Sequence, residues 1–362
     1  MNRSRSTGSG TRIRRFVLLA AAAATIGGFA ICLHPFEVCL GEPPPPGPTS
    51  REAGREAGPC SAAGGIEAWQ LPPDAAAIRG LLAELDEGYR VVRTPAFAII
   101  SDVAIDRVET LAGLAEDTLR CVRQAAAVWR VPLRRPPCKM TIVYLSDERM
   151  FATWRERAGV APSPLVPGFF DAAHNRGVVW DSRSSASAAA GPGVEAEARR
   201  VAIRHEVAHL VMHNVDLPAG PHGPQRRWLE EGLAMRFETP EAVNLPRLHD
   251  FLAADSARDP AWWRRLVFEA AFLDTVGDES QSAYAASWAL VYHLSESRLA
   301  DFVSCVRGRG PTSAPASADK QLPFLLDADF VAGLWRHMEA VADRSGVRAS
   351  TSAPARKADS PE

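Results

Sequence analysis

The sequence has no pair of cysteines in C-x-x-C spacing, the arrangement of thiolate zinc sites and of thioredoxin-like redox pairs. Neither kind of site is therefore expected. The six cysteines are scattered along the chain, at Cys32, Cys39, Cys60, Cys121, Cys138 and Cys305. This distribution is compatible with an oxidising compartment. Cys121 and Cys138 could pair across a helix-to-strand connection, or both could remain buried free thiols.

An excess of positive charge is also missing. The 41 basic and 43 acidic residues give a formal net charge of −2. No overall positive field therefore attracts nucleic acid, and we expect no nucleic-acid partner.

Residues 191–196 match the dinucleotide-binding pattern G-x-G-x-x-A. That pattern requires a preceding strand, but here a Ser/Ala-rich stretch precedes it. We therefore expect no nucleotide cofactor.

The first 40 residues are typical of a signal peptide or an amino-terminal membrane anchor. Five arginines precede an uncharged apolar run, FVLLAAAAATIGGFAICL, at residues 16–33. The arginines are expected to stay in the cytoplasm. The run is at the short end of what spans a bilayer as a transmembrane helix, and Ala30 ends an acceptable cleavage site. Both alternatives place the rest of the chain on the periplasmic or extracellular side, and only an uncleaved segment would also bind the membrane.

Composition divides the remainder of the chain into three parts. Residues 41–67 contain four consecutive prolines and no apolar periodicity, which indicates a Pro/Gly/Ala-rich linker. Residues 68–343 carry apolar periodicity over a length that can bury a sizeable core, so we expect the folded domain there. The composition of residues 344–362 is typical of a disordered tail.

The apolar spacing within the domain predicts an α+β fold in which a small mixed sheet precedes a helical half. We expect a short amphipathic helix at residues 75–88, a first strand at 95–102, a long helix at 106–129, a strand at 139–145, a β-hairpin at 168–182 and helices from 194 to about 341.

The segment RHEVAHL at residues 204–210 is the first candidate for chemistry. In a helix, residues four apart lie on one face about 6 Å from each other, so His205 and His209 can direct two imidazole nitrogens at one ion. The alternative is a pair of ordinary helix histidines that bind no metal. Glu206 is then rotated toward a water that the ion would hold. A catalytic zinc needs a third protein ligand and one open position. His213 continues the spacing but lies too far along the helix axis to share the ion.

The third ligand is expected from a second helix. Met212 and Val215 stand where metzincins have glycine and histidine, which excludes that class. The segment RRWLEEGLAMRFE at residues 226–238 offers carboxylates instead. HEVAH followed by WLEEGLA resembles the gluzincin superfamily of zinc metallopeptidases, which includes thermolysin-like and aminopeptidase branches. The resemblance is closest to a group of poorly characterised bacterial peptidase-like domains.

The resemblance implies roles for two glutamates. In gluzincins the third zinc ligand is the glutamate just before the glycine of this segment, which corresponds to Glu231; the neighbouring Glu230 is expected to be solvated. Glu238 follows seven residues later and returns to within about 20° of the same helix face. Related aminopeptidases have a glutamate there that supports a ligand histidine, and an ordinary surface glutamate is the alternative.

A tyrosine is implied in the same way. The segment SAYAASWALVYHL at residues 282–294 resembles the aminopeptidase segment whose leading tyrosine stabilises the tetrahedral oxyanion. This implies that Tyr284 has that role, whereas core packing at a helix start is the alternative. Tyr292 lies eight residues further on and is expected to face a different direction.

Together these residues predict an enzyme that holds one Zn²⁺ per chain and hydrolyses peptide bonds of a peptide or protein substrate, most simply as an endopeptidase. Glu206 would accept the proton of the attacking water and deliver it to the leaving amine. The strand RGVVW at residues 176–180 is the expected edge for an extended peptide. No G-x-M-E-N segment is present, so the loop that anchors a free amine in aminopeptidases has no counterpart. The alternative is a catalytically inactive gluzincin-fold binding module at the cell envelope.

Overall fold

The computed structural model describes residues 67–85, 87–160, 167–181, 192–219, 226–274, 278–308, 322 and 326–347. All of them belong to one compact unit, Gly54–Glu362. The expected export segment, almost all of the linker and the tail from residue 348 lie outside the described residues. Among the helices that are described, none combines the length and the apolar character needed to cross a bilayer.

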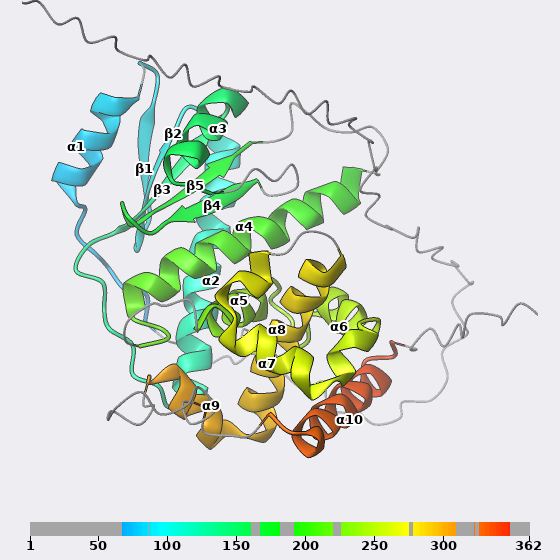
Figure 1. Cartoon of the computed structure of the whole chain (residues 1–362). Helices are drawn as coiled ribbons and strands as arrows, with labels where there is room; N and C mark the ends of the chain where they lie inside the picture. Colours follow the sequence, from blue (N-terminus) through cyan, green and yellow to red (C-terminus); the bar gives the residue numbers. More distant parts are fainter. Residues whose placement is uncertain are drawn as a thin grey trace, which may run out of the picture. The chain divides into compact units, whose positions relative to one another are not determined.

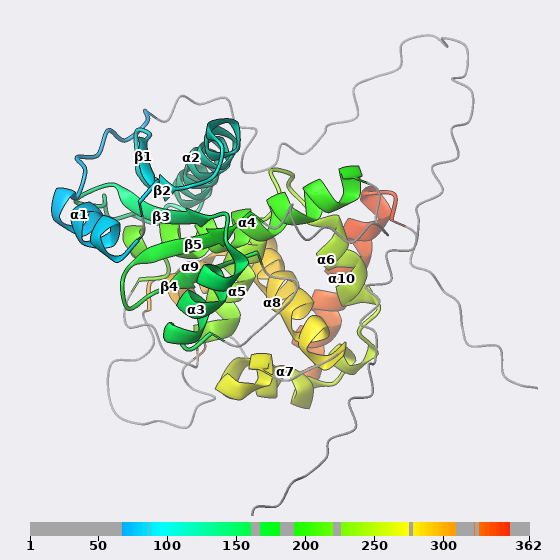
Figure 2. The same ribbon diagram turned by 90° about the horizontal axis from the view of Figure 1, so that it is seen from above.

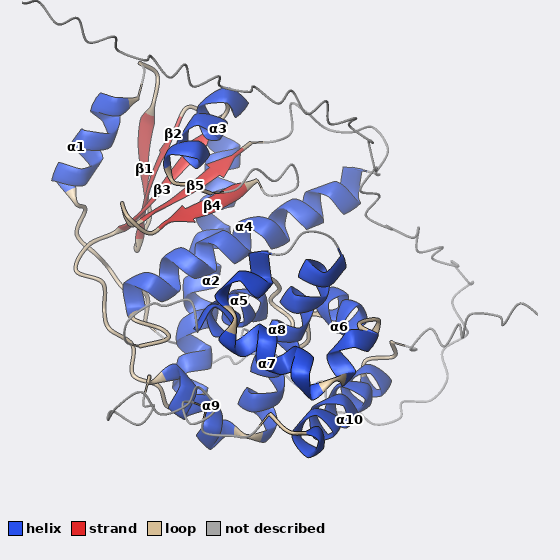
Figure 3. Cartoon of the chain, in the orientation of Figure 1, coloured by secondary structure: helices blue, strands red, loops and turns tan. Residues whose placement is uncertain are grey.

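The sheet has five strands in the described part of the chain (Figure 1 and Figure 3). They are β1 (Arg90–Arg93), β2 (Phe97–Ser101), β3 (Met140–Leu145), β4 (Gly168–Asp171) and β5 (Arg176–Trp180). Their spatial order is β1-β2-β3-β5-β4. The three inner strands β2, β3 and β5 are parallel, whereas β1 and β4 pair antiparallel with their neighbours at the two edges.

Four helices cover the two faces of this sheet. They are α1 (Ala75–Glu84), α2 (Ile105–Val128), α3 (Glu148–Arg157) and α4 (Pro192–Val215). Successive side chains of a strand point to opposite faces. Ile100 and Val143 therefore pack with α1 and α3, while Ile99 and Ile142 pack with α2 and α4. Figure 2 shows α2 and α3 on opposite sides of the strands.

The helical half lies on the other side of α4 (Figure 1). Its α-helices are α5 (Arg227–Arg236), α6 (Leu245–Leu252), α7 (Pro260–Phe268), α8 (Asp278–Ser297), α9 (Leu299–Val306) and α10 (Ala328–Arg344). Helix α8 is the central one, because α5, α6, α9 and α10 all pack against it. Its residues Ala285, Trp288 and Leu290 are fully buried, as expected of a helix with neighbours on every side.

The sequence-based predictions of the mixed sheet, the long helix, the hairpin and the helical half are confirmed. Two predictions about strands were wrong. The strand at 97–101 is not the first, because the short segment Arg90–Arg93 pairs with it as β1. RGVVW is not an edge either: it forms β5, which pairs with β3 on one side and β4 on the other, so β4 is the edge strand. Helix α3 was not predicted.

Cys121 and Cys138, for which the sequence left both a pairing and free thiols open, do not pair with each other. Cys138 is a free thiol, and so is Cys305. Cys121 is disulfide-bonded. The free thiol of Cys138 agrees with the alternative expectation, whereas the disulfide-bonded Cys121 does not.

Candidate metal centre

Helix α4 carries both histidines of the HEVAH segment on one face. Burial of Val207, Leu210 and Val211 in the core fixes the rotation of the helix. The face that remains turns His205 and His209 toward α5, and their Nε2 atoms lie 3.0 Å apart. Each side chain keeps only a small exposed fraction, 14% and 18% respectively. The two imidazoles therefore converge on one point at the edge of the core.

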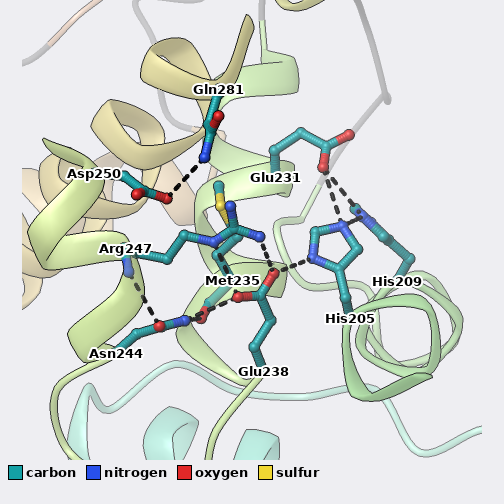
Figure 4. Close-up of polar contacts among 9 residues, drawn as sticks. All are labelled: His205, His209, Glu231, Met235, Glu238, Asn244, Arg247, Asp250 and Gln281. Atoms are coloured by element: carbon teal, nitrogen blue, oxygen red, sulfur yellow. Dashed lines mark hydrogen bonds and ion pairs between the residues drawn. The ribbon is translucent and has the colours of Figure 1, made fainter. Parts of the chain in front are cut away.

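Helix α5 brings a carboxylate to the same point. Glu231 Oε2 lies 3.3 Å from His205 Nε2 and 3.4 Å from His209 Nε2. All three donor atoms fall within 4.8 Å of one another, and they form the one such His/Cys/Asp/Glu group among the described residues. Figure 4 shows Glu231 reaching both rings from the neighbouring helix. Neither Glu230 nor His213 belongs to this group, and the His213 ring packs against Phe170 instead.

The glycine after Glu231 explains how α5 reaches this position. A Cβ atom at Gly232 would lie 2.4 Å from the backbone oxygen of Ser287 and 2.6 Å from Cγ2 of Val291. Only a residue without a side chain allows α5 and α8 to approach this closely. Gly232 thus sets the depth at which α5, and Glu231 with it, sits in the helical half.

The three donor atoms fit a zinc ion. Tetrahedral zinc with nitrogen and oxygen ligands at about 2.0–2.1 Å has its donor atoms about 3.3 Å apart. The distances observed here are 3.0, 3.3 and 3.4 Å. Neutral imidazole and carboxylate are also donors that zinc prefers. His205, His209 and Glu231 could therefore hold one ion and leave a fourth position open.

Glu238 selects the tautomer of His205. Its Oε1 lies 2.9 Å from His205 Nδ1, and an ionised carboxylate only accepts hydrogen bonds. Nδ1 must therefore carry a proton, which leaves the lone pair of Nε2 for the metal position. Helix α5 ends at Arg236, so the expectation that Glu238 continues the helix face of Glu231 was wrong. The chain turns after Phe237 and brings Glu238 to the far side of the His205 ring.

Two residues at the start of α6 hold Glu238 in place (Figure 4). Asn244 Nδ2 donates to Glu238 Oε2 at 2.9 Å, and Arg247 donates to both carboxylate oxygens, at 3.1 and 2.9 Å. Asn244 also caps α6, because its Oδ1 accepts from the Arg247 backbone N–H. Glu238 is only 2% exposed. A carboxylate this deeply buried needs such partners to remain ionised.

The titration behaviour of the cluster follows from these contacts. Burial alone would lower the pKa of His205, but hydrogen bonds to Glu231 and Glu238 outweigh it and raise that pKa to about 10. Burial opposes ionisation of Glu238, but the charge of Arg247 and the bond to His205 lower its pKa to about 2. The two histidines similarly hold the pKa of Glu231 well below its usual range, against the effect of burial. The carboxylates thus carry the negative charge that attracts a cation.

Glu206 lies between the histidines and the edge strand β4. A Cβ atom at Gly168 would lie 3.2 Å from Glu206 Cγ, so the missing side chain on β4 makes room for this glutamate. The backbone N–H of Phe170 donates to its carboxylate. Burial raises the pKa of Glu206, although the nearby histidines and the Phe170 N–H oppose the shift. A carboxyl group with a raised pKa is suited to exchange protons near neutral pH.

Tyr284 and Tyr292 of α8 lie in different surroundings. Tyr284 is half-buried; burial and the negative charges of Glu231 and Glu206 raise the pKa of its phenol, and a hydrogen bond from Arg227 opposes this. It therefore faces the candidate metal centre as a protonated phenol. Tyr292 is 3% exposed and packs against Trp288, on the side of the helix that faces α10.

Sequence reasoning missed four residues of this site: Gly168, Arg227, Asn244 and Arg247. Arg227 could have been found, because it precedes Glu231 by four residues on a predicted helix, the spacing of an ion pair. Asn244 and Arg247 form an N-cap signal in N-L-P-R, but nothing in that segment indicates that it faces Glu238. Gly168 offers no local signal, because its role depends on Glu206, which lies 38 positions further along the chain.

Comparison with known families and proteins adds one finding. A family model described as a protein of unknown function, DUF1570, matches residues 200–315. The matched region contains all six residues that the sequence predicted for the site. No curated protein matches the chain.

Proposed function

We propose that this protein is a zinc-dependent hydrolase of peptide bonds in the gluzincin group, acting most simply as an endopeptidase on peptide or protein substrates. One observation carries the proposal: two imidazole nitrogens and one carboxylate oxygen converge at 3.0–3.4 Å with the half-buried Glu206 beside them. A cation bound at this point would take the place of the imidazole protons and join the three donor atoms, with neutral imidazoles and a charged carboxylate as its ligands. His205, His209 and Glu231 would hold one Zn²⁺ per chain.

The bound zinc would act as a Lewis acid and bring the pKa of a coordinated water to near 7. Glu206 accepts the proton of the attacking water and returns it to the leaving amine. Tyr284 donates a hydrogen bond where negative charge develops on the substrate carbonyl oxygen, because its phenol keeps its proton at neutral pH. Glu238 keeps His205 in the tautomer that presents Nε2 to the metal position.

The edge strand β4 is suited to hold an extended substrate. Of its two sides, one pairs with β5, and no strand among the described residues pairs with the other. Gly168 and Phe170 of β4 both adjoin Glu206. A peptide that adds to this edge as a further strand would therefore run past the catalytic glutamate. A segment that anchors a free amine is missing from the sequence, which favours cleavage within a chain.

The test compares the wild-type protein with Glu206→Gln on a mixture of peptides, with mass-spectrometric identification of the products. Both proteins are first loaded with zinc and their metal content is measured. The substitution should retain the zinc and the fold but lower hydrolysis by several powers of ten, because it removes the proton acceptor. Hydrolysis by the Gln variant at the wild-type rate would refute the mechanism. Stoichiometric zinc without hydrolysis in either protein would favour an inactive binding module.

We also propose that the domain lies outside the cytoplasm. The arginines before the apolar run at 16–33 support this orientation. The disulfide of Cys121 also supports it, since disulfides persist mainly in oxidising compartments. Alkaline phosphatase fused at residue 70 should be active, because this reporter requires disulfides of its own and these form outside the cytoplasm. An inactive phosphatase together with an active cytoplasmic reporter at the same position would overturn the proposal.

A further inference from the structure

Helices α5 and α8 run in the same direction and meet in a fixed register. At the middle of the contact, Gly232 lies against the backbone of Ser287. Toward the end of both helices, the guanidinium of Arg236 lies over the Tyr292 ring at 5.2 Å from its centroid. One turn toward the start of each helix, the same register brings Arg227 opposite Tyr284. The approach permitted by Gly232 therefore determines which α5 residue meets this tyrosine.

Arg227 contacts two residues of the candidate metal centre at once. Its Nε lies 3.9 Å from Glu231 Oε1, the oxygen that does not face the histidines. Its guanidinium also hydrogen-bonds the Tyr284 hydroxyl. Arginine has N–H donors and no acceptor. The phenol oxygen must therefore accept this hydrogen bond, and the O–H proton of Tyr284 is left to be donated to another group.

We infer that Arg227 is a positioning residue: it occupies a lone pair of the Tyr284 oxygen and thereby turns the phenol proton toward the reacting carbonyl. The inference rests on the proposed function, because only peptide hydrolysis would bring a reacting carbonyl to this position. The contact between the two side chains can nevertheless be measured without activity. The planar guanidinium suits this task because one face can approach Glu231 while another N–H reaches the phenol. Without Arg227, the hydroxyl could rotate toward the nearby negative charge of Glu231.

The first experiment observes Tyr284 directly. The chain has four tyrosines, so a protein labelled with ¹³C at tyrosine Cζ gives few signals, and Tyr284→Phe identifies the Tyr284 signal by its loss. Arg227→Met should shift that signal and leave the other three in place, in both the metal-free and the zinc-loaded protein. Arg200→Gln is the matched control, because Arg200 is an exposed arginine of α4 that pairs with Glu197. An unchanged Tyr284 signal in Arg227→Met would overturn the inference.

The second experiment measures kcat and KM on a cleaved peptide. Arg227→Met should lower kcat about tenfold while zinc content and KM stay nearly constant, and Arg227→Lys should recover part of the loss because it retains a donor. In the Tyr284→Phe protein, adding Arg227→Met should lower kcat by less than about twofold further, because the effects of residues that act through one group are not additive. Losses that multiply would show that Arg227 acts independently of Tyr284 and would overturn the inference.

The two experiments separate the possible failures. If the wild-type protein hydrolyses no peptide, the proposed function fails, and the Tyr284 signal still decides whether Arg227 holds the phenol. If the protein is active but the Tyr284 signal is the same in the wild-type protein and in Arg227→Met, the proposed function stands and the inference fails. If Arg227→Met does not fold, the other three tyrosine signals reveal it, and Arg227→Ala, which also removes the donor, replaces it in both experiments.

Discussion

Two pairs of histidines in this protein have nearly the same separation and opposite electrostatics. His205 and His209 on α4 place their Nε2 atoms 3.0 Å apart. His293 on α8 and His337 on α10 place their Nδ1 atoms 2.9 Å apart. The first pair has the carboxylates of Glu231 and Glu238 within hydrogen-bonding reach. The second pair has the Ser297 hydroxyl and the positive charge of Arg298 nearby.

The pKa values of the two pairs show the effect of these surroundings. Hydrogen bonds to carboxylates raise the pKa of His205 to about 10 in spite of burial. Burial, together with the charges of His337 and Arg298, lowers the pKa of His293 to about 4. A dication would meet negative charge at the first pair and positive charge at the second. The separation of two imidazoles therefore does not define a metal site, and the neighbouring carboxylates do.

The largest expected effect is the selective loss of metal from the first pair. Glu231→Ala should lower zinc affinity more than a hundredfold, because it removes a ligand and its charge. Loss of a residue that only hydrogen-bonds a ligand typically lowers metal affinity roughly 10–100-fold. His337→Ala should retain one zinc per chain. Isothermal titration with Zn²⁺ measures both. Equal zinc binding by the wild-type protein and Glu231→Ala would remove Glu231 from the site and erase the distinction between the two pairs.

Helix α8 offers a second comparison, because it carries one tyrosine beside each pair. Tyr284→Phe should lower kcat about a hundredfold with little change in KM or zinc content, since a donor to the oxyanion acts mainly in the transition state. Tyr292→Phe, on the same helix beside His337, should keep the wild-type kcat. Steady-state kinetics on one peptide substrate checks both variants. Equal losses in the two variants would assign Tyr284 to core packing.

The second pair should affect the pH dependence of the free energy of unfolding and not metal binding. Because the folded-state pKa of His293 is about 4 and its ordinary value is 6.5, the unfolded chain takes up this proton at a higher pH than the folded chain. The stability contributed by neutral His293 is present above pH 6.5 and is lost as the pH falls toward 4. Between pH 6.5 and pH 4 the loss should reach about 3 kcal/mol.

Urea unfolding at several pH values measures this loss as the difference between the wild-type protein and His293→Leu. Taking the difference removes the contribution of the carboxylates, which titrate in both proteins. The free energy of unfolding of the variant should vary less between pH 6.5 and pH 4. Parallel pH profiles for the two proteins would show that His293 does not titrate as its surroundings indicate.

The smallest expected effect concerns the support of His205. Glu238→Gln should weaken zinc binding about tenfold, because the neutral amide still accepts the bond from Nδ1 but no longer increases the basicity of the imidazole. Glu296→Gln is a matched control near the second pair, since Glu296 is an exposed partner of Arg236. Zinc affinity measured by competition with a chelator compares the two. Indistinguishable affinities would mean that Glu238 serves the fold alone.

The contrast between the pairs also shows what a sequence pattern can predict. The spacing of HEVAH placed His205 and His209 on one face because helix geometry is local and repeats every 3.6 residues. The same kind of reasoning failed for Glu238, where the helix ends two residues earlier at Arg236. It also failed for RGVVW, because the position of a strand within a sheet depends on its partners and not on its own alternation.

The sequence by itself determined the α+β layout, the helix that carries two imidazoles on one face, and, through the resemblance, which glutamate and tyrosine to test. Only the tertiary structure decided that Glu231 Oε2 reaches both imidazoles, that Asn244 and Arg247 keep Glu238 charged, and that Gly168 leaves room for Glu206. The physical reason is range. Helical periodicity acts over a few residues, whereas these contacts join α4, α5, α6 and β4, whose approach is set by packing of the whole core.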